Sequence, residues 1–294
     1  MIIRKAAVAG SFYPRFKKDL INILKESFVN KEFGPGEEPK TLNQEKRSIL
    51  GGVSPHAGYI YSGCVAAFTF LNLFREKIPD TVIVLGTDHI GYGKIALMDE
   101  GEWETPLGNI SIDEELSKKI LEKSQIINND ESAFIGFPFG REHNIEVQLP
   151  FIKYCAQGKD VKFVPIIISN RDFNVLNELA NDIAKVIELH DKDVVIVASS
   201  DMTHKEVYDS KELNKFKERD QQVIDAFVNG DPKNTLEAAL KTTVCGPQTI
   251  TSLIMICKNL NASSGKLLKY YTSSEKTGNI SGYCVGYFSG ILMK

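Results

Sequence analysis

Thr81-Val-Ile-Val-Leu-Gly-Thr-Asp-His89 joins a continuous, β-branched apolar run to a polar segment that ends in histidine. A short apolar run of this kind is typical of a strand that is buried on both faces, as in a sheet covered by helices. Two later runs, 161–168 and 193–198, have the same composition. Together the three runs predict the centre of a parallel or mixed β-sheet.

The segments around these runs have the spacing and the turn residues of helices and further strands. Asp113 has the position of a helix N-cap, and Pro106-Leu-Gly108 has that of a hairpin turn. Helices are expected up to about residue 30 and over 62–74, 113–123, 144–155, 174–189, 211–228, 232–241 and 248–260. Strands are expected over 49–53, 266–272 and 283–292, with a hairpin over 103–112. Residues 1–14 are expected to form a strand that ends in the turn Ser11-Phe-Tyr-Pro14. Strands that alternate with helices imply an α/β fold whose sheet is covered on both faces.

The chain has 294 residues, a length that suits one large α/β domain or two small ones. The charged segment 31–47, which is interrupted by Gly and Pro, is expected to be a loop, and no change of composition marks it as a domain boundary. We therefore expect a single domain over residues 1–294. A chain of this length can bury most of its apolar surface, so a metal would be functional rather than structural.

The composition argues against several classes of partner. The formal net charge is −3 and no long basic run occurs, which disfavours a nucleic-acid backbone. No stretch approaches the roughly 18 apolar residues of a membrane span, and the apolar run near the N-terminus is too short for a secretion signal. The five cysteines include no Cys-x-x-Cys pair, which favours a reducing compartment. We expect a soluble, cytoplasmic protein without nucleic-acid or membrane partners.

Histidines follow three of the predicted strands. His56, His89 and His204 each come shortly after a buried strand, and Asp201 precedes the last of them. In open α/β sheets, ligands bind beyond the carboxyl ends of the strands. Each histidine alone could be a loop residue with a satisfied hydrogen bond, but three at one edge predict a functional site. Imidazole is the commonest metal ligand and is suited to proton transfer near neutral pH.

His143 and His190 are the other two histidines. His190 lies between a helix and a strand, and we expect it to be a surface loop residue. His143 opens a predicted helix beside Glu142 and shares a helix face with Glu146, three residues further on. The two glutamates could supply a base or a ligand, or they could simply favour the helix N-terminus.

Cys245 has a different setting from the other four cysteines, for which we expect the role of small buried apolar residues. Gly246-Pro247 breaks the chain just before a predicted helix, so the thiol lies near a helix N-terminus, where the dipole favours the thiolate. A thiolate is a nucleophile or a soft ligand for copper, iron or zinc. The alternative is a half-buried cap residue.

Several common enzyme signatures are missing from the sequence. It contains neither G-x-G-x-x-G nor a Walker A motif, so the use of a dinucleotide or ATP has no support. It also contains no G-x-S-x-G, the nucleophile turn of serine hydrolases.

Several motifs run across nearly the whole chain. They are Ala9-Gly-Ser-Phe-Tyr-Pro14, Pro55-His-Ala-Gly-Tyr59 with Tyr61-Ser-Gly63, Gly86-Thr-Asp-His89, Trp103-Glu-Thr-Pro-Leu-Gly108, Glu142-His-Asn-Ile-Glu-Val-Gln-Leu-Pro-Phe151, Ser199-Ser-Asp-Met-Thr-His204 and Cys245-Gly-Pro247. Their order and spacing together resemble those of the Memo family, the Memo component of the AmmeMemoRadiSam group.

The fold of this family is similar to that of the class III extradiol dioxygenases, which use non-haem Fe(II). The resemblance implies a single-domain α/β/α sandwich with a central mixed, largely parallel sheet. It also implies a metal-capable cleft in which His56, His89 and Cys245 match the ligand positions. Asp201 and His204 match positions beside it. A carboxylate completes the ligand set in the dioxygenases, so the thiolate of Cys245 shifts the expected metal towards softer ions such as Cu(I).

The sequence departs from the family pattern at two charged positions. Asp88 precedes His89 where a less acidic residue is expected, and Lys205 follows His204 where an aromatic residue is common. These charges could change affinity or substrate, but they leave the implied ligands intact.

Three functions follow from these residues. The first is a metal-dependent redox protein, oxygenase- or oxidase-like, that holds Fe(II), copper or zinc, with His204 oriented by Asp201 as acid or base and His143 as a second proton donor. The second is a non-enzymatic protein that sequesters a metal or recognises a peptide or small molecule in the same cleft. The third is a metal-free hydrolase or transferase with Cys245 as nucleophile and His204 as base.

Overall fold

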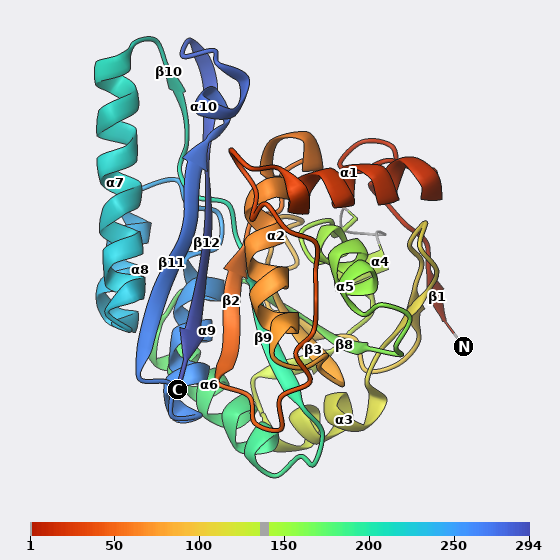
Figure 1. Ribbon diagram of the computed structural model, residues 1–294. Helices are drawn as coiled ribbons and strands as arrows, with labels where there is room; N and C mark the ends of the chain where they lie inside the picture. The colour runs from red at the N-terminus through yellow and green to blue at the C-terminus, as the bar shows by residue number, and fades with distance from the viewer. Residues whose placement is uncertain (1, 136–140) are drawn as a thin grey trace.

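Four parallel strands occupy the centre of the fold, in the spatial order β2 (Ile49–Ser54), β9 (Val194–Ser199), β3 (Thr81–Thr87) and β8 (Lys162–Ile168). They belong to a nine-stranded sheet in the computed structural model, which describes residues 2–135 and 141–294 (Figure 1). The three apolar runs of the sequence are therefore central strands, as predicted.

Further strands extend this sheet on both sides. On one side β12 (Gly282–Met293) pairs antiparallel with β2, while β11 (Ser264–Thr272) and β10 (His204–Val207) both pair antiparallel with β12. On the other side β4 (Ile95–Leu97) pairs antiparallel with β8 and parallel with β7 (Ile127–Asn129). The sheet is mixed, as predicted.

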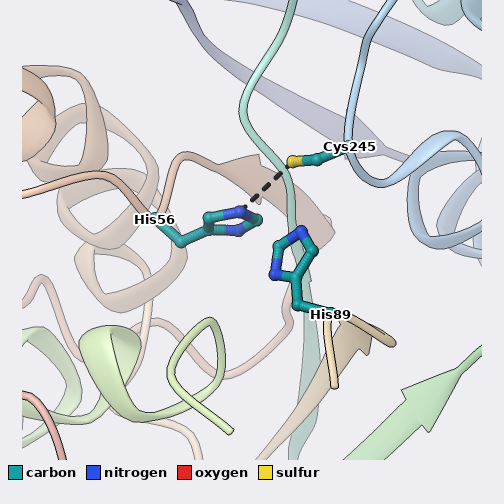
Figure 2. Close-up of side chains that lie close together, drawn as sticks. All are labelled: His56, His89 and Cys245. Carbon is teal, nitrogen blue, oxygen red and sulfur yellow. Dashed lines mark hydrogen bonds between the residues drawn. The ribbon is translucent and has the colours of Figure 1, made fainter. Parts of the chain in front are cut away.

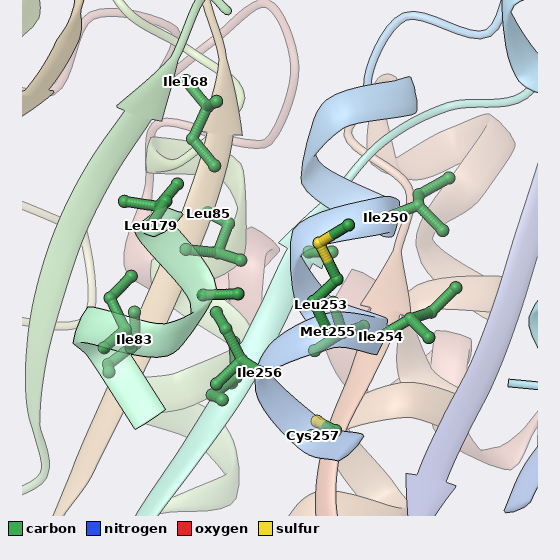
Figure 3. Close-up of a cluster of buried hydrophobic side chains, with 14 of the residues drawn as sticks. Ile83, Leu85, Ile168, Leu179, Ile250, Leu253, Ile254, Met255, Ile256 and Cys257 are labelled. Carbon is green, nitrogen blue, oxygen red and sulfur yellow. The ribbon is translucent and has the colours of Figure 1, made fainter. Parts of the chain in front are cut away.

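Strand β3 illustrates why a central strand is apolar at every position. Ile83 and Leu85 point into one hydrophobic core, and Val82 and Val84 point into the other, because successive side chains of a strand alternate between the two faces. All four are fully buried. The core that holds Ile83 and Leu85 continues to Leu253 and its neighbours on a covering helix (Figure 3).

Helices cover both faces of the sheet, which gives the α/β/α sandwich (Figure 1). One face is covered by α1 (Lys17–Val29), α2 (Tyr59–Arg75) and α5 (Leu149–Cys155). The other is covered by α3 (Glu114–Lys123), α6 (Phe173–Glu188), α7 (Ser210–Val228), α8 (Pro232–Leu240) and α9 (Pro247–Asn259). Within the described ranges, no helix combines the length and apolar composition that crossing a membrane requires.

Short elements complete the structure. They are the helices α4 (Ser132–Ile135) and α10 (Ser273–Thr277), a 3-10 turn at Glu146–Gln148, and a small sheet of β1 (Ile3–Arg4), β5 (Glu102–Trp103) and β6 (Ile110–Ser111). The pairing of β5 with β6 confirms the predicted hairpin, and the side chain of Asp113 caps α3 as expected.

Most of the predicted helices and strands are confirmed, but two segments differ. The predicted N-terminal strand is wrong beyond Ile3–Arg4, because the amides of Ala7 and Val8 donate to a carboxylate, Glu146, rather than to a neighbouring strand. The turn predicted after it is confirmed, since the N–H groups of Ser11 and Phe12 both donate to the carbonyl oxygen of Val8. The helix predicted over 144–155 begins only as a turn and a 3-10 helix. The short strands β4, β7 and β10 were not predicted, since runs of three or four residues carry little periodicity.

The prediction that His190 is a surface residue is wrong. Its exposed fraction is only 8%, whereas the preceding residue, Leu189, is 81% exposed. The backbone N–H of His190 donates to the carbonyl oxygen of Ile187, so the chain turns back beneath the end of α6 and carries the imidazole inwards. Neither of its ring nitrogens has a hydrogen-bond partner among the described residues.

Candidate metal centre

The loops that follow β2 and β3 bring His56 and His89 to the same edge of the sheet, where Cys245 meets them from the loop before α9. One donor atom from each residue lies within 4.8 Å of the other two. Nε2 of His56 is 3.2 Å from Sγ of Cys245, and the two imidazole centroids are 5.2 Å apart (Figure 2). We call these three residues the donor cluster.

The hydrogen bonds of Ser199 determine which nitrogen of His56 carries its proton. Nδ1 of His56 lies 3.0 Å from Oγ of Ser199. Ser199 donates its hydroxyl proton to the carbonyl oxygen of Asn144 (2.7 Å), and its oxygen accepts a hydrogen bond from Nε2 of Gln148 (2.9 Å). Because the hydroxyl proton is already used, Nδ1 of His56 must donate to Ser199. The imidazole lone pair is then on Nε2, which faces Cys245.

Both imidazoles of the donor cluster favour the neutral form. Burial lowers the pKa of His56 well below its usual value, and proximity to His89 and His143 lowers it further. Part of the His89 ring is open to solvent, yet desolvation and the neighbouring His143 and His204 lower its pKa to about 4. Neutral imidazoles keep a lone pair, which is the form that binds metals.

Cys245 contradicts the expectation that the helix dipole favours its thiolate. The residue stands just before Gly246, the N-cap of α9, and its sulfur accepts a hydrogen bond from the backbone N–H of Asp201 (3.2 Å). Burial nevertheless raises the pKa of the Cys245 thiol, and the nearby Asp201 carboxylate raises it further. Without a cation the thiol therefore stays protonated, whereas a bound metal ion would deprotonate it.

Asp201 joins the turn that carries His56 to the partly exposed His204. Its Oδ1 accepts hydrogen bonds from the backbone N–H groups of His56 (2.7 Å) and Ala57 (3.3 Å), and its Oδ2 lies 3.8 Å from Nε2 of His204. Burial raises the pKa of Asp201 to about 6, although His204 and the two amides act in the opposite direction. Asp201 is therefore placed to hold the His56 turn and to orient His204.

His143 lies against the donor cluster. Its ring stacks on that of His89, with centroids 5.0 Å apart and an interplanar angle of 12°, and it lies 5.9 Å from the ring of His56. Phe12 packs on it from the N-terminal segment, with centroids 5.1 Å apart. Burial lowers the pKa of His143, so it too favours the neutral form.

Glu146 and Glu142 have structural roles, so the alternative in which they supply a base or a ligand is wrong. Glu146 is fully buried, pairs with Arg4 (2.6 Å) and accepts hydrogen bonds from Tyr13 and from two amides of the N-terminal segment. The side chain of Glu142 accepts a hydrogen bond from the backbone N–H of Ile145 (2.6 Å). Both carboxylates are thus occupied in holding this part of the chain.

The carboxylate of Asp88 is occupied by its own loop. It accepts hydrogen bonds from four successive backbone N–H groups, at distances between 2.7 and 3.1 Å, in residues 90–93. Gly91 and Gly93 have positive φ angles, which bend the loop around the carboxylate. Asp88, the acidic residue that departs from the family pattern, therefore shapes the loop that begins at His89.

The three predicted metal ligands and the three residues predicted to act beside them all line one cavity of about 850 Å³. They are His56, His89, Cys245, His143, Asp201 and His204. Lys205 is exposed on β10 and is not among the lining residues. The support that Ser199, Asn144 and Gln148 give to His56 was not predicted, because their hydrogen bonds depend on how separate loops meet.

A family model and sequence relatives match nearly the whole chain. A family model described as Memo-like protein matches residues 4–291. A MEMO1 family protein of Desulfurococcus amylolyticus is 37% identical over 287 residues, which cover 97% of this chain and 96% of the relative. One of Pyrococcus furiosus is 38% identical with full coverage of both chains. An uncharacterized Escherichia coli K12 protein, JW3007, aligns in structure with a TM-score of 0.47 and 12% identity, over 81% of this chain and 99% of that one.

Proposed function

The chain belongs to the Memo-like protein family, and on that premise we propose that it is a metal-binding redox protein that holds iron or copper at His56, His89 and Cys245. The observation that carries the proposal is the convergence of three donor atoms within 4.8 Å. These atoms come from segments that are distant in sequence and lie at the edge where α/β sheets bind ligands.

The donor set suits a borderline or soft ion. Two neutral imidazoles and one thiolate are typical ligands of copper, iron and zinc, and the thiolate favours copper over the harder ions. Ser199 keeps the lone pair of His56 on Nε2, as a ligand role requires. Iron or copper, when bound, supplies Lewis acidity and one-electron chemistry at this point.

The residues around the donor cluster would handle protons and position a ligand. His204 lines the cavity with Nε2 3.8 Å from the Asp201 carboxylate, so it can exchange a proton with a ligand and be stabilised when charged. His143, stacked on His89, is the second candidate for proton transfer. Phe12 packs against the ring of His143, and its apolar side chain would help to orient it.

The first test is metal uptake. After anaerobic purification and loading, elemental analysis is expected to find close to one equivalent of iron or copper, and less than a tenth of an equivalent would contradict the proposal. Cys245→Ser should weaken binding by more than the roughly 10–100-fold that follows the loss of a supporting partner. Cys64→Ser, which removes a thiol outside the donor cluster, is the matched control and should bind normally.

A second candidate function, metal sequestration or ligand binding without turnover, is supported by the same donor cluster. Oxygen consumption or hydrogen peroxide production by the metal-loaded protein separates the two. Turnover that is lost in His56→Ala supports the redox function, whereas tight metal binding without turnover supports the binding role.

The short contact between Cys245 and His56 also bears on a thiol nucleophile. The imidazole against the thiol is His56, and not His204 as the sequence suggested, and the raised pKa of Cys245 disfavours a reactive thiolate. Iodoacetamide labelling of Cys245 that metal loading fails to block would support this function. Protection by metal would contradict it.

A further inference from the structure

We propose that the cavity beside the donor cluster binds an uncharged organic molecule that carries a hydroxyl or amide group, and that Ser274 forms a hydrogen bond with that group. The proposal deepens the function proposed above, since it names the ligand class of the same site. The volume of about 850 Å³ falls within the roughly 300–1,000 Å³ of small-molecule sites. A water molecule takes up only about 30 Å³, so the space suits an organic ligand.

The charges around the cavity disfavour an anion. Among the described residues that line it, none is Lys or Arg, and Asp201 supplies a negative charge. Even with a divalent ion bound, the thiolate of Cys245 and the carboxylate of Asp201 would balance the charge of the metal. An anion that entered would lose its hydration without gaining a cationic partner.

Cations are also disfavoured, because the Asp201 carboxylate already has partners. The N–H groups of His56 and Ala57 occupy its Oδ1, and His204 lies 3.8 Å from its Oδ2. Beyond the donor cluster and its neighbouring histidines, the lining consists mainly of aromatic and hydroxyl side chains, such as Tyr61 and Tyr283. A neutral ligand with an apolar body fits this surface.

The hydroxyl side chains of helix α10 line the cavity, whereas its two charged side chains contact other parts of the protein. Glu275 pairs with Lys217 of α7 (2.6 Å), and Nζ of Lys276 lies 4.2 Å from the centre of the Phe33 ring. The residues of α10 that line the cavity are Ser273, Ser274 and Thr277. In Figure 1, α10 lies at the same end of the sheet as β10, which begins at His204.

Ser274 gives a second reason to expect a ligand in the cavity, besides the charge of its lining. It is 5% exposed and lines the cavity, yet its hydroxyl has no hydrogen-bond partner among the described residues. The neighbouring Ser273 differs, because its Oγ accepts a hydrogen bond from the backbone N–H of Val285 (3.0 Å). Ser274 therefore has a free hydroxyl on the cavity lining, and this hydroxyl is the group of α10 that we expect a ligand to engage.

The test uses three probes of nearly equal shape: benzamide, benzoate and benzamidinium. Calorimetric titration of the metal-free, full-length protein is expected to show benzamide binding at least about tenfold more tightly than either charged probe. Ser274→Ala should weaken benzamide by about fivefold or more. Equal affinities for the three probes, an unchanged affinity in Ser274→Ala, or no binding at millimolar concentrations would each overturn the proposal.

Two variants that each add a positive charge test whether the probe binds in the cavity or elsewhere on the surface. Ser281, which is exposed and lines the cavity, is replaced by Lys, and Ser281→Lys is expected to raise benzoate affinity by about fivefold or more. Ser263→Lys adds the same charge outside the lining and should leave benzoate binding unchanged. Equal effects of the two would place the probe outside the cavity.

Metal uptake, measured separately on the same preparations, distinguishes the two proposals. Normal uptake without the charge preference refutes the ligand class alone. The charge preference without metal uptake refutes the metal-binding function alone.

Discussion

The contacts of Glu146 and the donor cluster both bring polar groups from distant segments together, but only the contacts of Glu146 pair a charge with a counter-charge. Glu146 meets the guanidinium of Arg4, the hydroxyl of Tyr13 and the amides of Ala7 and Val8, so its negative charge is fully matched. We call this group of residues the N-terminal anchor. In the donor cluster the imidazoles favour the neutral form, and three donor atoms from separate loops converge within 4.8 Å of one another.

The N-terminal anchor fits a structural role, whereas the donor cluster fits the metal-binding role proposed above. In the N-terminal anchor the polar atoms satisfy one another, so the group stabilises the fold by itself. In the donor cluster, the hydrogen bonds of Ser199 keep the lone pair of His56 on Nε2, where it faces Cys245. Substitutions should therefore affect stability in the first region and metal affinity in the second.

Breaking the N-terminal anchor should have the largest effect on stability. Glu146→Ala leaves Arg4, whose side chain is only 3% exposed, without its counter-charge and should lower the free energy of unfolding by about 3–5 kcal/mol. Denaturant unfolding measures this loss. The exposed pair of Lys5 and Glu104 is the control, and Lys5→Ala should cost about 0–1 kcal/mol. A similar small cost for Glu146→Ala would show that the anchor adds nothing beyond a surface ion pair.

Glu142, next to the N-terminal anchor, should make stability depend on pH. Burial raises its pKa from 4.5 to about 7, although Arg4 acts in the opposite direction. Because the folded state holds the proton more tightly, the stabilisation is fully present below about pH 4.5 and is lost as the pH rises through about 7. The shift corresponds to up to about 3 kcal/mol.

The test compares the wild type with Glu142→Gln between pH 4.5 and 8. Unfolding free energies of the wild type should fall relative to those of the variant as the pH rises across this range. The comparison of slopes is needed because the Gln amide also changes the hydrogen bond to Ile145. Parallel pH profiles for the two proteins would contradict the raised pKa.

The centre of the sheet could be predicted from the sequence, because β3 fills two cores and therefore needs apolar residues at successive positions. The edge that carries His56 and His89 could be predicted as well, since the carboxyl ends of parallel strands meet at one edge. The approach of Cys245 to them followed only from the family resemblance.

The rest could not be predicted, because it depends on contacts between residues far apart in the chain. Arg4 and Glu146 are separated by 142 positions, and nothing local marks them as partners. Their pairing explains why the predicted N-terminal strand is cut short. His190 was placed wrongly because a polar residue in a short connection resembles a surface residue, whereas here the chain turns it inwards.

Ser199 offers a sharper test of the donor cluster. Ser199→Ala removes the acceptor for Nδ1–H of His56, so the imidazole can take the other tautomer, and metal affinity should fall by about 10–100-fold. Ser289→Ala removes another fully buried serine hydroxyl, one that contacts Thr69 and not the cluster, and should leave metal affinity unchanged. Ser199→Thr keeps the hydroxyl and should restore binding. Equal metal affinities in the two alanine variants would show that Ser199 serves only the fold.

Asp88 combines features of both regions and should have the smallest effect. Its carboxylate is satisfied by four amides, as in the N-terminal anchor, but the loop it holds begins at His89. In Asp88→Asn the amide nitrogen faces the N–H of Gly93, so one charge-assisted hydrogen bond is lost, at a cost of about 1–3 kcal/mol in loop closure. The Gly93 amide should then exchange hydrogen faster, and metal affinity should fall by about tenfold or less.

The control for this substitution is Asp172→Asn, at the N-cap of α6. It removes the same charge from a carboxylate that accepts hydrogen bonds from the backbone N–H groups of Asn174 and Val175, away from the donor cluster. Stability should fall there without any change in metal affinity. If Asp88→Asn also lowers stability without changing metal affinity, the loop holds His89 in place without Asp88. The carboxylate would then have a structural role, like Glu146 in the N-terminal anchor. A selective loss of metal affinity would instead place Asp88 with Ser199, as a residue that positions a donor.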